Sequence, residues 1–108
     1  MTLGSNQLSA LQMMAGAPWA GWCEVRGGFV LDSHSNTDRV MRSLVKHGLV
    51  TVVVENVGGG YGRYELNYEE AIKIPEVSDY LRRLFTLDCY RQGAAWERWS
   101  DSLTPPRA

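Results

Sequence analysis

The chain has little of what several large classes of protein depend on. It holds two cysteines and four prolines among 108 residues, and its 11 basic and 12 acidic side chains leave a formal net charge of −1. This balance argues against a protein that binds polyanions through an excess of positive charge. The apolar share of 44% is that of an ordinary globular domain, which argues against disorder and collagen-like order. The length leaves room for one domain with a modest core.

Long apolar runs and targeting signals are missing as well. No apolar run approaches the roughly 20 residues that a membrane-spanning helix needs. The first residues, Met1 to Asn6, contain neither the basic segment nor the apolar segment of a secretory signal. We therefore expect a cytoplasmic protein that makes no membrane contact.

Residues that bind metals or carry out catalysis are sparse. Cys23 and Cys89 lie 66 positions apart with no second thiol near either, which fits reduced thiols better than a disulfide framework or a zinc site. His34 and His47 lack the ligand spacing of a zinc site, and neither has an obvious nucleophile to activate. The sequence therefore predicts no enzyme, no metal site and no cofactor.

Glycines and helical periodicity divide the first half of the chain into elements. A first helix is expected from Ser5 to Ala15, ending at Gly16. Residues 19–32 contain two short extended runs around a glycine pair, and either a small hairpin or a short helix with a strand would fit them.

A second helix is expected over residues 37–47. The polar stretch at residues 32–37 precedes it and supplies side chains that accept hydrogen bonds from free helix N–H groups. Apolar residues then recur at helical spacing on one face, namely Val40, Met41, Leu44 and Val45. Gly48 is expected to end this helix as a left-handed cap.

A β-hairpin is expected directly after this helix. Residues 49–55 have the β-branched content of a strand, and residues 61–68 alternate between apolar and polar side chains. The glycine cluster at residues 58–62 lies between them. A glycine-rich phosphate loop would open a helix, whereas this cluster leads into a strand pattern, so we interpret it as a hairpin turn.

The last third of the chain has the pattern of two further helices. The first is expected from about Val77 to Arg91, and a second, shorter helix is expected after Gly93. The tail from Thr104 onward is expected to be frayed.

The order of these elements resembles that of a known family. Arg42 to Val50 (RSLVKHGLV) has the pattern of a recognition helix that runs into a wing, and Gly60 to Leu66 (GYGRYEL) that of the returning wing strand. Over residues 5–68 the chain is similar to the winged helix-turn-helix domains of small bacterial and phage transcriptional regulators.

The resemblance implies an α+β fold with a winged-helix domain at residues 1–70. Residues 71–108 would then form a C-terminal helical extension. One region departs from the family pattern, because residues before Asn36, where a further helix is expected, include Gly21, Gly27 and Gly28 and lack a helical pattern.

The second helix has the chemistry that DNA recognition requires. A helix fits the major groove, and long basic side chains on its solvated face reach phosphates or guanine. Three basic residues against Asp38 give this helix a local charge of about +2. The expected DNA-contacting residues are Ser35, Asn36, Thr37, Arg39, Arg42, Ser43 and Lys46 on the helix, with Tyr61 and Arg63 on the wing. So few phosphate contacts imply weak, salt-sensitive binding by one copy, which favours a homodimer.

The C-terminal extension allows two interpretations. Its apolar stripe could fold back onto the first helix and complete the core. It could instead form a dimer or partner interface, because tryptophan and tyrosine dominate interface hot spots. The candidate interface residues are Tyr80, Leu81, Leu84, Phe85, Trp96 and Trp99.

The sequence thus predicts a small transcriptional regulator that binds double-stranded DNA as a homodimer. The alternative is a protein-interaction module with the same fold, such as a phage-encoded inhibitor that docks on a host or defence complex. The near-neutral charge and the four tryptophans favour the alternative.

Overall fold

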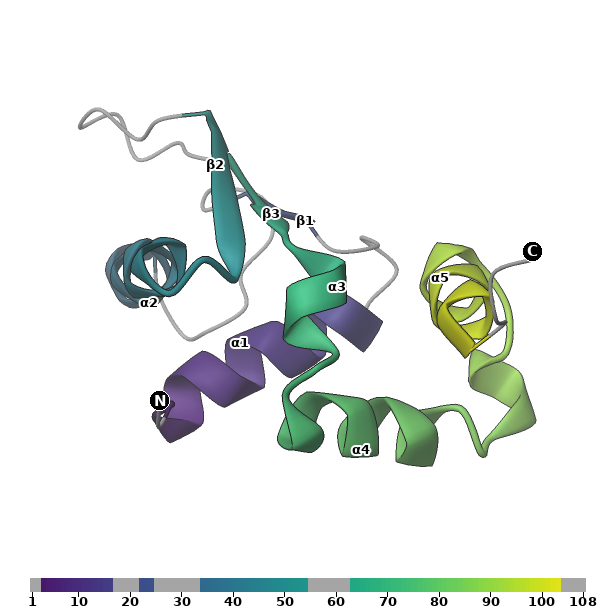
Figure 1. Cartoon of the computed structure of the whole chain (residues 1–108). Helices are drawn as coiled ribbons and strands as arrows, with labels where there is room; N and C mark the ends of the chain where they lie inside the picture. The colour runs from purple at the N-terminus through teal and green to yellow at the C-terminus, as the bar shows by residue number, and fades with distance from the viewer. Residues whose placement is uncertain (1–2, 17–21, 25–33, 55–62, 104–108) are drawn as a thin grey trace, which may run out of the picture.

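The computed structural model describes residues 3–16, 22–24, 34–54 and 63–103 (Figure 1). These residues form helices and strands in the order α1 (Ser5–Gly16), β1 (Trp22–Glu24), α2 (His34–Lys46), β2 (Val50–Val54), β3 (Arg63–Leu66), α3 (Tyr68–Ala71), α4 (Pro75–Leu84), the short 3-10 helix η1 (Asp88–Tyr90) and α5 (Ala94–Leu103). The α+β class expected from the sequence is confirmed.

Three antiparallel strands form the sheet in the order β1-β3-β2, with β3 at the centre. Trp22 of β1 lies opposite Glu65, and Val50 of β2 lies opposite Leu66. A bulge interrupts the β2–β3 ladder between Val52 and Val54. The expected hairpin strands are therefore present, while the glycine-rich turn between them lies outside the described residues.

β1 resolves part of the ambiguity at residues 19–32. Residues 22–24 form a strand, and its partner is the distant strand β3. Residues 25–33, which would hold the second helix of a helix-turn-helix pair, lie outside the described residues.

Gly48 joins α2 to β2 with a left-handed backbone, at a φ of 73°. The Gly48 N–H donates to the carbonyl of Val45 at 3.0 Å, and the Leu49 N–H donates to the carbonyl of Leu44 at 3.1 Å. These two bonds are the Schellman arrangement, which satisfies carbonyls at the end of a helix and favours glycine at this position. The predicted helix end is confirmed.

One core joins the N-terminal elements to the C-terminal helices. α1 lies at its centre, packed against both α2 and α4 (Figure 1). A Cβ atom added at Gly16 would lie 2.8 Å from Cδ2 of Leu84, so the end of α1 approaches α4 closely. The core residues are Ala10, Leu11, Met14, Ala15, Val40, Met41, Leu44, Leu49, Val50, Tyr64, Leu66, Tyr68, Ala71, Val77, Leu81, Phe85, Ala95 and Trp99.

α4 is shorter than the helix predicted at residues 77–91. It begins with Pro75 in its first turn, where a missing N–H costs little, and it ends at Leu84. The Thr86 hydroxyl donates to the carbonyl of Arg83 at 2.7 Å, and the Arg91 guanidinium donates to the carbonyl of Phe85 at 2.6 Å. Side chains thus bind carbonyls that a continuing helix would use, which explains the error.

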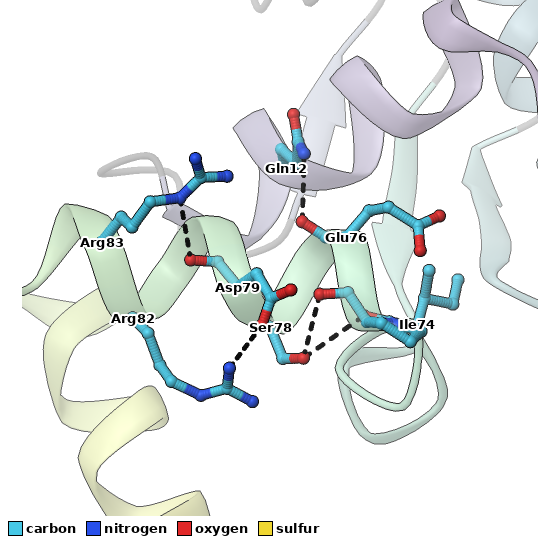
Figure 2. A network of polar contacts seen from close by, with 8 residues as sticks. Gln12, Ile74, Glu76, Ser78, Asp79, Arg82 and Arg83 are labelled. Atoms are coloured by element: carbon cyan, nitrogen blue, oxygen red, sulfur yellow. Dashed lines mark hydrogen bonds and ion pairs between the residues drawn. The ribbon is translucent and has the colours of Figure 1, made fainter.

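The polar face of α4 carries hydrogen bonds and an ion pair (Figure 2). The Gln12 amide of α1 donates to the carbonyl of Glu76 at 3.1 Å and so links the two helices. Arg82 pairs with the carboxylate of Asp79 one turn earlier, and Arg83 donates to the carbonyl of Asp79 at 3.4 Å.

Candidate nucleic-acid interface

The solvent-exposed face of α2 carries three basic side chains, which we call the basic stripe: Arg39, Arg42 and Lys46. Their spacing of three and four residues places them on one side of the helix. The opposite side, with Met41 and Leu44, is fully buried. Together with Asp38 and Ser43, the basic stripe lines an open surface hollow of about 420 Å³. This side of α2 is therefore available to a ligand.

Asp38 joins the basic stripe to the sheet. The Tyr64 hydroxyl of β3 donates to Asp38 Oδ1 at 2.5 Å, and Arg42 Nε lies 2.9 Å from Asp38 Oδ2. The Asp38 side chain is only 15% exposed, whereas the Arg42 side chain is 56% exposed. The carboxylate thus binds a buried tyrosine on one side and an exposed cation on the other.

Sequence reasoning missed the roles of Asp38 and Tyr64. Asp38 entered the prediction only as a negative charge, although its spacing of four residues from Arg42 is a recognisable signal for an ion pair. No local signal links Asp38 to Tyr64, because their contact depends on how the sheet packs against α2.

Asn36 and Arg39 form a second contact on the same helix. Arg39 Nη2 donates to Asn36 Oδ1 at 2.6 Å, and both residues lie near the N-terminal end of α2. Two of the predicted contact residues are therefore held next to each other at the helix end from which base edges would be approached.

Two of the predicted contact residues are buried or engaged in hydrogen bonds within the protein. Thr37 is fully buried, and its hydroxyl has no hydrogen-bond partner in the part of the chain that the structure describes. The Ser43 hydroxyl accepts a hydrogen bond from the Gln7 amide of α1 at 3.0 Å and donates to the carbonyl of Val40 at 2.6 Å. Burial removes Thr37 from the set of accessible residues, and Ser43 links α2 to α1.

The remaining predicted contact residues lie at the ends of elements. Arg63 begins β3, is half-buried, and has its guanidinium 3.8 Å from the Glu65 carboxylate. Ser35 lies in the first turn of α2, but its side chain is not among those described. Tyr61 lies outside the described residues.

The candidate interface residues of the C-terminal helices mostly fill the core. Leu81, Phe85 and Trp99 are buried, so they are not accessible on the surface of one copy. The ring of Phe85 lies 5.3 Å from that of Trp96 and 6.4 Å from that of Trp99. The partly buried members of this set, namely Tyr80, Leu84 and Trp96, pack around that core. The stripe therefore folds back onto the body of the protein, as the first interpretation had it.

Exposed apolar side chains occur instead in the segment around η1. Leu87 is 55% exposed and Tyr90 is 48% exposed. Neither residue is among the predicted interface residues, and both lie in the segment expected to continue the helix to Arg91.

Two buried tyrosines, Tyr64 and Tyr68, have raised pKa values. Burial, together with the hydrogen bond to the Asp38 carboxylate, raises the pKa of Tyr64 to about 12, against the opposing effect of Arg42. Burial also raises the pKa of Tyr68 to about 12, while Arg98 acts in the opposite direction. The Arg98 guanidinium lies 4.5 Å from the centre of the Tyr68 ring.

The described part of the chain contains no group of three or more His, Cys, Asp or Glu side chains arranged to hold a metal ion. None of its helices combines the length and the hydrophobicity needed to cross a membrane.

Comparison with known proteins gives no relative. No protein-family model matches the chain, and neither a curated protein nor a solved structure is significantly similar to it.

Proposed function

We propose that this protein binds double-stranded DNA through the basic stripe of α2 and acts as a small transcriptional regulator. The observation that carries the proposal is the position of Arg39, Arg42 and Lys46 on the exposed side of a helix whose other side is buried. Side chains on such a helix can reach bases and phosphates of the major groove.

The arrangement of α2 and the hairpin supports the winged-helix resemblance. α2 leads through Gly48 into β2, and β2 pairs with β3, as the resemblance requires. In Figure 1 the hairpin rises beside α2, and α5 lies at the opposite end of the molecule. Arg63 at the start of β3 would contribute a further cation from the wing.

The charge of the site also favours binding as a homodimer. One copy offers three cations on α2 and one on β3, so its phosphate contacts are few. Two copies on adjacent half-sites would double these contacts. Tyr80, Leu84 and Trp96, which are only partly buried, are the predicted interface residues that remain for a subunit contact. Sedimentation equilibrium is expected to give a dimer on DNA, and a single copy per duplex would contradict this part of the proposal.

The direct test is the affinity of Arg42→Ala/Lys46→Ala for a mixed-sequence DNA duplex of about 20 base pairs at low salt. Loss of two phosphate contacts is expected to weaken binding at least tenfold. It should also reduce the slope of log affinity against log salt by about 2 from a wild-type magnitude of roughly 3.6 per copy.

A matched control is available on α4. Arg82→Ala/Arg83→Ala removes the same charge and also breaks one ion pair, but at a helix away from the basic stripe. It is expected to retain wild-type affinity within about twofold. Equal binding by wild type and Arg42→Ala/Lys46→Ala would contradict the proposal.

Exposure of Leu87 and Tyr90 favours the second candidate function, a protein-interaction module. Exposed aromatic and aliphatic side chains are the usual anchors of protein interfaces. A stoichiometric protein partner whose binding is lost in Leu87→Ser/Tyr90→Ser, together with no mobility shift of DNA, would favour this function over DNA binding.

A further inference from the structure

An acidic side chain, that of Asp38, lies next to the basic stripe. Asp38 lines the same surface hollow as Arg39, Arg42 and Lys46. On electrostatic grounds alone, a carboxylate at this place weakens the attraction between the helix and a polyanion. Its presence in the proposed interface therefore needs a physical explanation.

The two oxygens of Asp38 bind groups on two different elements. Oδ1 accepts a hydrogen bond from the Tyr64 hydroxyl of β3 at 2.5 Å, and Oδ2 lies 2.9 Å from Nε of Arg42 on α2. Tyr64 is 2% exposed, so its hydroxyl is fixed by the packing of its ring in the core. Tyr64 of the sheet thus fixes the Asp38 carboxylate, and the carboxylate in turn fixes Arg42.

We propose that Asp38 and Tyr64 are positioning residues, which fix Arg42 in one orientation for the DNA contact before DNA binds. This inference depends on the proposed function. An unrestrained arginine loses much rotamer freedom when it binds a phosphate or a base, whereas an arginine already held through Nε loses less. The 56% exposure of the Arg42 side chain keeps the held group accessible to a ligand.

The same contact also connects α2 to the hairpin. Tyr64 directly follows Arg63, the proposed wing cation, at the start of β3. Because Asp38 binds both Tyr64 and Arg42, it fixes the position of the basic stripe relative to the start of this strand. The distance between the basic stripe on α2 and Arg63 on β3 is then fixed before both contact the same DNA duplex.

The test compares Asp38→Asn with Asp79→Asn. Each substitution removes one negative charge, and each breaks a pair between an aspartate and an arginine on one helix face. Asp79 lies on α4, outside the basic stripe, so this variant controls for net charge. The measured quantity is the affinity for a mixed-sequence duplex of about 20 base pairs at low salt.

The positioning role predicts that Asp38→Asn binds DNA roughly three- to tenfold more weakly than wild type, despite its more positive charge. Asp79→Asn is expected to bind as well as wild type or slightly better. An affinity of Asp38→Asn equal to or above that of wild type would overturn the inference while leaving the proposed function intact. Absence of DNA binding by wild type would overturn the proposed function and the inference with it.

Tyr64→Phe provides a second variant that keeps the charge and the core packing. Removal of the hydroxyl leaves the pair between Asp38 and Arg42 but frees the carboxylate from β3, so DNA affinity is expected to fall less than in Asp38→Asn. The thermal midpoint of each variant is measured in parallel, and binding is measured well below it. An unchanged affinity in Tyr64→Phe would remove Tyr64 from the positioning role.

A readout without DNA separates positioning from a merely structural effect. In proton–nitrogen NMR spectra, the Arg42 Nε–H signal of wild type is expected to show slow exchange with water and a rigid relaxation profile. Asp38→Asn should abolish both properties at Arg42, whereas Asp79→Asn should leave them unchanged. A mobile Arg42 Nε–H in wild type would overturn the inference whatever the affinities are.

Discussion

At the scale of single residues, two buried tyrosine hydroxyls differ in their partners. The Tyr64 hydroxyl donates to Asp38, whereas the Tyr68 hydroxyl is buried and has no hydrogen-bond partner among the described residues. A buried polar group that lacks a partner lowers stability by about 1 to 3 kcal/mol, and a satisfied one contributes about 1 kcal/mol. The two side chains are thus similar in burial but opposite in what their hydroxyls contribute.

These tyrosines make stability sensitive to high pH. Each has a pKa near 12 in the folded protein and an ordinary value of 10.0. Because the folded value is the higher one, the contribution is fully present below pH 10 and is lost as the pH rises toward 12. The urea midpoint of wild type is therefore expected to fall over this interval, and that of Tyr64→Phe/Tyr68→Phe to fall less.

Tyr90→Phe is the control for this titration, because it removes the hydroxyl of an exposed tyrosine. It is expected to show the same alkaline loss as wild type. An identical alkaline loss in Tyr64→Phe/Tyr68→Phe would show that other groups cause it.

At the scale of elements, the junction between α2 and β2 depends on one glycine. Gly48 has a φ of 73°, and a Cβ atom at this position would meet nothing within 4 Å. The cost of a side chain here is therefore backbone strain alone. Gly48→Ala is expected to lower the free energy of unfolding by about 1 to 2 kcal/mol, as measured by urea denaturation.

Gly48→Asn is the graded control, because asparagine adopts the left-handed region more readily than alanine. It should cost less than Gly48→Ala. Equal stability of Gly48→Ala and wild type would contradict the role assigned to this cap.

The sequence could predict the elements whose boundaries depend on residues close to one another in the chain. The apolar face and the glycine cap of α2 lie within a few residues of each other, and both predictions are confirmed. The pairing of β1 with β3 joins residues about 40 positions apart, so no local pattern could specify it. The end of α4 was missed because it depends on side-chain bonds from Thr86 and Arg91.

In the candidate site, too, local spacing could be predicted from the sequence, whereas tertiary contacts could not. Helical spacing placed Arg39, Arg42 and Lys46 together on the exposed side of α2. The same spacing places Thr37 on the side of Met41 and Leu44, so its burial could have been predicted from the sequence. The link from Asp38 to Tyr64 could not, because it arises from tertiary packing.

At the scale of the whole molecule, the C-terminal helices complete the core of the N-terminal elements. α4 packs on α1, and Val77 and Leu81 are fully buried in the cluster that contains Leu11 and Met14. A chain that ends at residue 70 would leave this apolar face of α1 in water. It is therefore expected to lose cooperative urea unfolding and dispersed NMR signals.

A chain that ends at Leu103 is the control, because it keeps α1 to α5 intact. It is expected to unfold in a single transition. Cooperative unfolding of the chain that ends at residue 70 would instead establish residues 1–70 as an independently stable unit.

The bulge in β2 has a consequence for the behaviour of the chain at high concentration. Among the described strands, β2 lies at an edge of the sheet, with the sequence VTVVV, and Val53 is 47% exposed. An uncharged, valine-rich edge is a template for intermolecular strand pairing and amyloid-like aggregation. The bulge between Val52 and Val54 breaks the regular ladder of this strand, and irregular edges are poor templates. We therefore expect the irregularity in the β2–β3 ladder to lower the tendency of the folded protein to aggregate through this edge.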